Sequence, residues 1–165
     1  MGWLPDPLHP AVIHFPIALV FVALAFELVA RHPRGQGLAT AAGVLVVVAA
    51  LGAVAAVVTG NWAADEAVVS RKVAERVEDH EERGEVAMWT LLVVAAVRVL
   101  AGARRWLAGA RGWVYIALLA LAAVAVVRAA QAGGRLVFEH GVGVAAATGE
   151  APGPSAQGET AATQP

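Results

Sequence analysis

Five histidines are the residues of this sequence best suited to holding a metal ion or haem, and two of them open a long apolar run. His9 and His14 lie in the stretch Leu-His-Pro-Ala-Val-Ile-His-Phe-Pro, residues 8–16. Neutral imidazole is the commonest metal ligand in proteins, and it is also an axial ligand of haem. Because an imidazole inside a membrane needs a polar partner, these two histidines direct attention to whatever the fold places beside them.

The composition indicates an integral membrane protein. Of 165 residues, 59% are hydrophobic and 15% are charged, whereas soluble domains average about 45–50% and about 25%. The chain has no cysteine, which excludes disulfides, iron–sulfur clusters and covalently attached haem. The net charge is −1 and there is no basic, aromatic-interleaved patch, so we expect no nucleic-acid partner. No phosphate loop or catalytic carboxylate pair predicts a hydrolase or kinase, and whether the chain is an enzyme stays open.

Four apolar segments have the length of a membrane-spanning helix, about 20 residues. They cover residues 10–30, 37–60, 85–103 and 112–131, and the paired glycines at 133–134 predict the end of the last helix. Between the second and third segments, helically spaced apolar residues predict an amphipathic helix over 62–83 that lies on the membrane surface, with His80 in its apolar stripe. We therefore expect an all-α fold: a four-helix transmembrane bundle within residues 1–145, with an additional amphipathic helix between spans 2 and 3. Residues 146–165 are expected to be a disordered tail.

The arginines set the expected orientation. The short connections at 31–36 and 104–111 carry five arginines and no acidic residue, whereas the 61–84 connection is mixed in charge. Lysine and arginine accumulate in cytoplasmic loops. We expect a multi-pass protein of the inner membrane, surrounded by the lipid bilayer, with both termini in the periplasm.

This topology gathers four of the five histidines at the periplasmic end: His9, His14, His80 and His140. We expect His14, His80 and His140 to form the core of a metal or haem site, with His9 as an additional ligand. His9 precedes the first span, so it is free to turn inward, and His80 should point toward the bundle. Arg128 and Arg135, near the same end, are the expected cofactor-binding partners of haem propionates.

Two features predict contacts between spans. Gly52, Ala56 and Gly60 recur every four residues in the second span, and such a stripe lets helix backbones approach closely, either within the bundle or against a partner. Glu27 and Arg98 stand at comparable depth in the first and third spans, where an ion pair would lower the cost of burying either charge.

These motifs resemble a family. The 8–19 stretch, the small-residue second span, the acidic loop with His80 and the segment Gly133–Gly143 look like the bacterial integral membrane family catalogued as domain of unknown function 2231. The likeness covers about residues 8–145, with Phe138 where tyrosine is expected in many members. It implies a four-helix layout similar to membrane cytochromes b, and related domains occur beside Rieske-type modules. Both implications favour electron transfer by analogy.

Three hypotheses follow. The first is a periplasmic-face histidine cluster that binds haem b or a transition metal ion for electron transfer, with a redox partner protein or a second copy of the chain. The second is a non-catalytic membrane subunit that packs against a partner through the small-residue second span. The third is a proton-linked transporter that uses Glu27 and Arg98.

Overall fold

The computed structural model describes residues 8–66, 69–101, 107 and 109–144, and every regular element in them is helical. The short helix α1 (His9–Val12) leads into α2 (His14–Val29), and a 3-10 turn, η1 (Pro33–Gly35), precedes α3 (Leu38–Glu66). Two further long helices follow, α4 (Arg71–Leu100) and α5 (Ala110–His140). The predicted all-α fold is confirmed, while the predicted tail at 146–165 lies outside the described residues.

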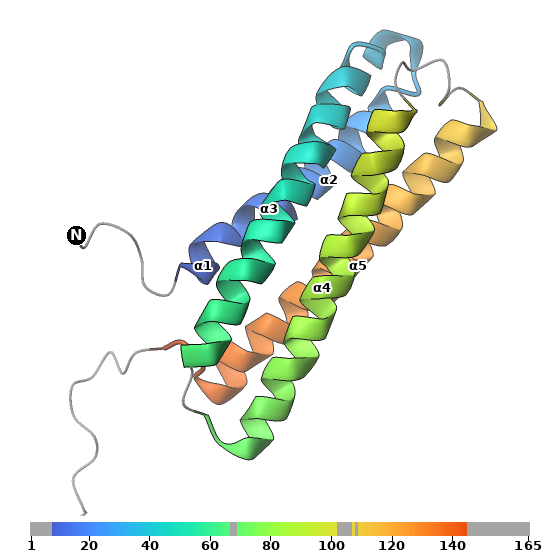
Figure 1. Cartoon of the computed structure of the whole chain (residues 1–165). Coiled ribbons are helices and arrows are strands. Elements are labelled where there is room, and N and C mark those ends of the chain that lie inside the picture. Colours follow the sequence, from blue (N-terminus) through green and yellow to red (C-terminus); the bar gives the residue numbers. More distant parts are fainter. Residues whose placement is uncertain (1–7, 67–68, 102–106, 108, 145–165) are drawn as a thin grey trace, which may run out of the picture.

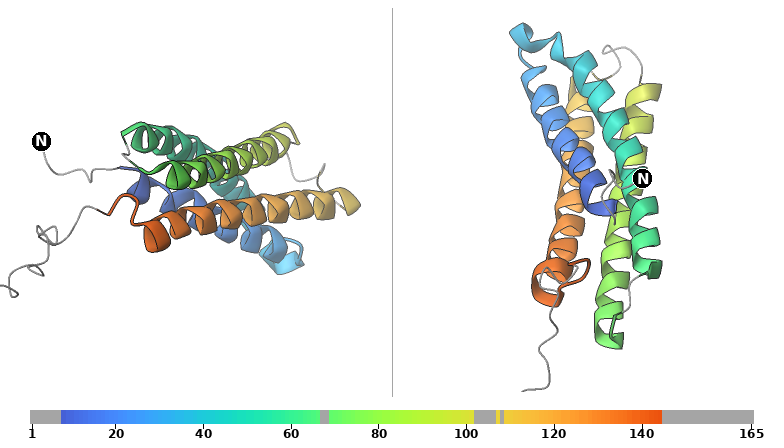
Figure 2. Two further views of the ribbon diagram at one scale, coloured as in Figure 1. Left: turned by 90° about the horizontal axis from the view of Figure 1, so that it is seen from below. Right: turned by 90° about the vertical axis from the view of Figure 1, so that its left-hand side faces the viewer.

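The long helices form an elongated bundle (Figure 1). Each packs against two others in the cyclic order α2, α3, α4, α5, and α2 lies at a tilt to the rest (Figure 2). Within the described residues, three stretches are long and apolar enough to cross a membrane: His9–Val29, Leu38–Asp65 and Ala110–His140. The core between the helices is built mainly from small and medium apolar side chains, among them Val20, Ala23, Val46, Leu91 and Leu119.

The two ends of the bundle differ. Helices α3, α4 and α5 continue past α1 toward the α3–α4 connection (Figure 1), and we call this the α3–α4 end and the opposite one the α2–α3 end. With 29 residues, α3 is about 43 Å long, which exceeds the hydrocarbon thickness of about 30 Å. The N-terminal segment therefore meets the bundle part-way along its length, where α1 lies against α3.

The separate amphipathic helix expected at 62–83 is not present as an element of its own. Residues 62–66 complete α3, and α4 runs without a break from Arg71 through Gly84 to Leu100. No proline interrupts this stretch, so the hydrogen-bond ladder of the helix continues through the glycine. The predicted apolar stripe packs along the bundle, as the partial burial of Val73, Val77 and His80 shows.

The paired glycines do not end α5. The helix continues through Gly133 and Gly134 and ends at Gly141, which adopts a left-handed conformation with φ of 65°. A left-handed glycine is a common helix terminator. The glycine at 133 instead has a packing role, described below.

Helix contacts explain the small residues of α3. A Cβ atom added at Gly52 would lie 3.2 Å from Cδ of Pro16, so the absent side chain lets α2 approach α3 closely. Pro16 also lacks the N–H that would bond to the Val12 carbonyl, where α1 ends. The stripe thus packs within the same chain at Gly52 and Gly60, and docking of a partner protein through this span stays a prediction.

Candidate functional site

His9 is the first residue of α1, and its imidazole turns onto α3. Its Nδ1 lies 2.8 Å from the carbonyl oxygen of Ala56, and because a carbonyl only accepts, Nδ1 must carry the proton. The Thr59 hydroxyl is 3.4 Å from the same nitrogen and donates to the Ala55 carbonyl. The ring lies directly over the α3 backbone, since a Cβ at Gly60 would be 3.0 Å from His9 Cε1.

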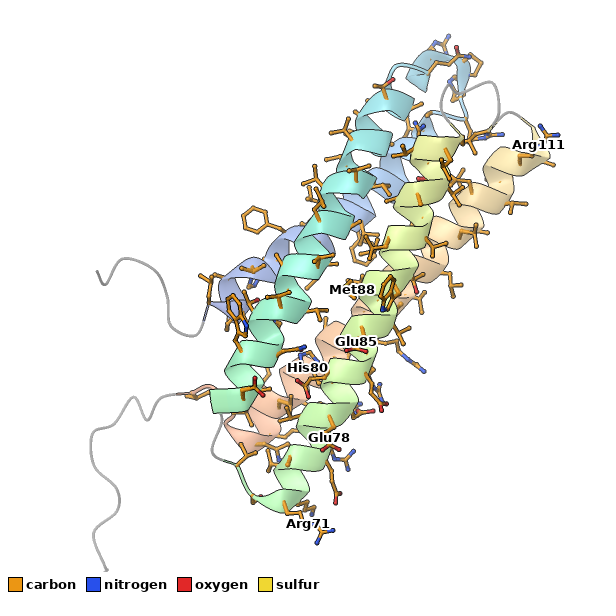
Figure 3. The ribbon with its side chains drawn as sticks, viewed as in Figure 1. Arg71, Glu78, His80, Glu85, Met88 and Arg111 are labelled. Atoms are coloured by element: carbon orange, nitrogen blue, oxygen red, sulfur yellow. The ribbon has the colours of Figure 1, made fainter. Side chains whose placement is uncertain are left out.

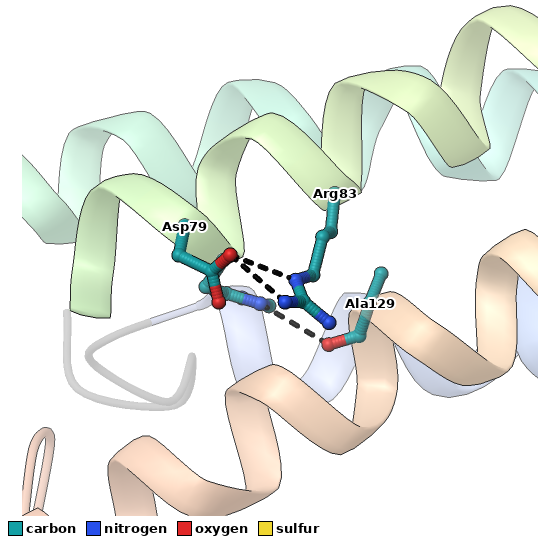
Figure 4. Close-up of polar contacts among 4 residues, drawn as sticks. Asp79, Arg83 and Ala129 are labelled. Carbon is teal, nitrogen blue, oxygen red and sulfur yellow. Dashed lines mark hydrogen bonds and ion pairs between the residues drawn. The ribbon is translucent and has the colours of Figure 1, made fainter. Parts of the chain in front are cut away.

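His80 lies against α5 in the same way that His9 lies against α3. It lies on α4, with Glu78 two residues before it and Glu85 five residues after it (Figure 3). Its Nδ1 is 3.2 Å from the Ala129 carbonyl of α5, so this nitrogen also carries its proton (Figure 4). A Cβ at Gly133 would lie 2.9 Å from His80 Cε1. The prediction that His80 points toward the bundle is confirmed.

The two imidazoles meet. Their ring centroids are 6.0 Å apart and their planes are inclined by 73°, an edge-to-face contact. Both side chains are partly buried. We call this unit the His9–His80 pair. With each Nδ1–H bonded to a backbone carbonyl, each Nε2 keeps its lone pair, which is the tautomer that metal-binding histidines adopt.

The other two predicted ligands are elsewhere. His14 is exposed on α2, and His140 is exposed as the last residue of α5. Within the described ranges, no group of three or more His, Asp or Glu side chains is placed to hold a metal ion. The expected convergence of His14, His80 and His140 is therefore not found. His14 follows His9 by five residues and so points away from α3 when His9 faces it, while the longer α5 carries His140 beyond the pair.

Arg128 and Arg135 are both exposed on α5. Among the residues described, neither forms an ion pair, whereas Arg83 of α4 pairs with Asp79 at 2.9 Å (Figure 4). A role for Arg128 and Arg135 toward a cofactor remains a prediction.

Burial and neighbouring charges tune the titratable groups around His80. Burial lowers the pKa of His80 below the usual 6.5, and the nearby His9 lowers it further. Burial also raises the pKa of Glu81, with the carboxylates of Asp65, Glu78 and Glu85 adding to the rise. The lowered pKa keeps His80 neutral near pH 7, the form that can donate a lone pair.

Several residues of the site were not singled out for it from the sequence. Ala56 and Ala129 contribute backbone carbonyls that bind the imidazoles, and Thr59 lies beside the first of them. Backbone carbonyls are present at every residue, so the sequence does not mark them. Gly60 and Gly133 belong to motifs that were noticed for other reasons: a small-residue stripe and a helix terminator. Each glycine faces a histidine across a contact between two helices. This pairing could be predicted from the sequence only if the neighbouring helices were already known.

One family of known proteins matches most of the chain. The model of the family described as "predicted membrane protein (DUF2231)" matches residues 5–146. The chain belongs to this family. The resemblance stated from its motifs is confirmed, and so is its membrane character. Neither the curated proteins nor the solved structures give a match.

Proposed function

We propose that this DUF2231 protein binds a transition metal ion at the His9–His80 pair, with the two Nε2 atoms as its protein ligands. One observation supports the proposal. Both imidazoles donate Nδ1–H to a backbone carbonyl, and the two rings are in edge-to-face contact. The carbonyl bonds fix the rings before any ion arrives, so little side-chain entropy is lost on binding.

The donor set limits the ion. Imidazole suits zinc, copper, iron and nickel, and the chain offers no thiolate. Two protein ligands leave coordination positions for water or for a reacting partner. An ion that changes oxidation state, copper or iron, would give the site the electron-transfer role that the sequence predicts.

Haem b fits this arrangement less well than a bare ion. Gly84 lies one turn after His80 on α4, and Val57 lies about one turn before Gly60 on α3. A Cβ at Gly84 would be 3.9 Å from the Val57 side chain. Helices α3 and α4 are thus in contact beside the pair, where a macrocycle needs an open slot. Haem would require these helices to separate, whereas a bare ion at the two Nε2 atoms needs no such slot.

We also propose how the protein lies in its membrane. Helices α3 and α5 run in the same direction, so α4 must return the chain along the full bundle between them (Figure 1). This supports a fourth span formed by the apolar second half of α4, although its first half is charged. The arginine-rich connections favour the α2–α3 end as cytoplasmic in an inner membrane. The His9–His80 pair would then face the periplasm, as would both termini.

The test is metal binding by the protein purified in detergent. The chain is stripped with a chelator, loaded with copper or zinc, desalted and analysed for metal. We expect about one ion per chain, as two ligands from one pair predict, and its loss in His9→Ala and in His80→Ala. His14→Ala and His140→Ala are matched controls that remove an exposed imidazole and should retain the ion.

Two results would overturn the metal proposal. Wild-type protein without stoichiometric metal would remove its basis, and equal metal loss in the control variants would show that binding is not at the pair. An absorption spectrum of the unstripped protein, oxidised and reduced with dithionite, tests haem separately. A Soret band lost in His80→Ala would replace the bare ion with haem.

A further inference from the structure

A second polar centre lies at the other end of the bundle, where Glu27 of α2 meets Arg98 of α4. Arg98 Nε donates to Glu27 Oε1 at 3.2 Å, and both side chains are about nine-tenths buried, with exposures of 10% and 9%. Arg98 also donates to the Ala39 carbonyl of α3. The ion pair predicted from the sequence is confirmed, and the metal proposal gives it no role.

Tyr115 of α5 completes this centre and poses a problem. Only 2% of the residue is exposed, and both Glu27 and Arg98 lie within electrostatic range of its hydroxyl. Yet the hydroxyl has no hydrogen-bond partner among the described residues. A buried hydroxyl without a partner is costly, and native structures usually satisfy such groups with protein or with ordered water.

We propose that an ordered water molecule binds between the Tyr115 hydroxyl and the Glu27–Arg98 ion pair. Water can accept from or donate to the hydroxyl, donate to a carboxylate and accept from a guanidinium, so it can satisfy three different groups at once. The site would be built by α2, α4 and α5, with α3 closing it from the fourth side through Ala39.

The Arg98 side of this site is closely packed. A Cβ at Gly43 of α3 would already lie 2.9 Å from Cζ of Arg98, so the guanidinium is held tightly against the helix backbone. A larger polar ligand, such as a carboxylate or the head group of a lipid, would have to displace it. Arg98 is also committed to Glu27 and to Ala39, which disfavours an added anion.

The water site is separate from the His9–His80 pair. His9 and Glu27 are 18 residues apart along α1 and α2, a rise of about 27 Å. Buried apolar side chains fill the core between them, including Val20, Ala23, Leu91 and Leu119. The water would therefore serve the ion pair locally, without a polar path across the bundle.

The experiment compares wild type with Tyr115→Phe, which removes the hydroxyl and keeps the ring. If water links it to the ion pair, the loss of a hydrogen bond lowers the melting temperature in detergent by about 2–4 °C. Thr90→Val is the control, because it removes a hydroxyl that bonds only within its own helix. A Tyr115→Phe protein that melts higher than wild type would show a hydroxyl without a partner and overturn the proposal.

A high-resolution structure of the wild-type protein gives the second readout. We expect an ordered solvent peak within hydrogen-bond distance of the Tyr115 hydroxyl and of Glu27 or Arg98. A hydroxyl bonded directly to Glu27, with no such peak, would refute the water even if Tyr115→Phe melted lower.

Discussion

The His9–His80 pair depends on glycines as much as on histidines. Each imidazole lies across a helix contact, and each reaches its carbonyl only because the facing residue has no side chain. Gly60 accommodates His9, and Gly133 accommodates His80. The same geometry therefore makes the pair sensitive to a single added methyl group.

Gly133→Ala should weaken the pair. The new Cβ would lie 2.9 Å from His80 Cε1, so the ring must shift away from Ala129, and we expect a loss of about 1–3 kcal/mol in the free energy of unfolding. Gly134→Ala is the matched control, since nothing lies within 4 Å of its Cβ and alanine favours a helix. Thermal unfolding of both variants in detergent measures the difference. Equal stability of the two would contradict the close approach of His80.

The stability of the metal-free protein should fall in mild acid. The folded state lowers the pKa of His80, so the unfolded chain takes up a proton first as the pH drops below 6.5. The contribution of neutral His80 to the free energy of unfolding is complete above that pH. It is lost as the pH falls through the lower pKa that His80 has in the folded state. His9 and Arg83 oppose protonation of His80, while Asp79 favours it. Melting temperatures between pH 8 and pH 5 should fall less steeply in His80→Gln; parallel curves would exclude His80 as the cause.

The residues of the pair were only half predictable from sequence. His80 lies in an apolar stripe, so its inward direction followed from helical periodicity. Its partner did not follow, because choosing between His9 and His14 required the break between α1 and α2 at Ile13. It also required the tilt of α2, whose Pro16 packs against Gly52 of α3. His140 was misplaced because Gly133 and Gly134 were taken for a helix end.

At the scale of elements, α4 is the helix that the sequence divides wrongly. Its charged first half and apolar second half differ enough in composition to suggest a surface helix followed by a span. Composition changes along a helix without breaking it, however, because the backbone hydrogen bonds need only the absence of proline. The continuous α4 carries His80 on a rigid element that packs against both α3 and α5.

Gly84→Pro tests this continuity. Proline there removes the backbone N–H within α4 and clashes with the carbonyl of His80, four residues earlier, at a cost of about 3 kcal/mol or more. Arg71→Pro is the control, because position 71 is the first residue of α4, where proline is tolerated. We expect Gly84→Pro to lower the melting temperature far more than Arg71→Pro. If residue 84 were in a loop between two helices, both variants would melt alike.

At the scale of the whole molecule, what the sequence predicts best is what depends on average composition. Membrane character, helical class and the Glu27–Arg98 pair all followed from hydropathy and depth, and all three are found. The ends of α3 and α4 at their connection were not predicted. There both helices extend beyond the apolar segments from which the spans were predicted. The His9–His80 pair lies where the apolar part of the bundle gives way to this extension, so its accessibility depends on how the membrane meets the helices.

The topology can be tested directly because the natural chain has no cysteine. Single cysteines are introduced as Glu82→Cys, exposed near the α3–α4 end, and Gly37→Cys, exposed at the α2–α3 end. With four spans and the α3–α4 end outside, a membrane-impermeant maleimide should label Glu82→Cys in intact cells and Gly37→Cys only in broken ones. Val124→Cys, on the exposed outer surface of α5, should face lipid and stay unlabelled in both. Labelling of both end positions from one side would contradict a crossing by α3, and the opposite pattern would keep the bundle but turn the His9–His80 pair toward the cytoplasm.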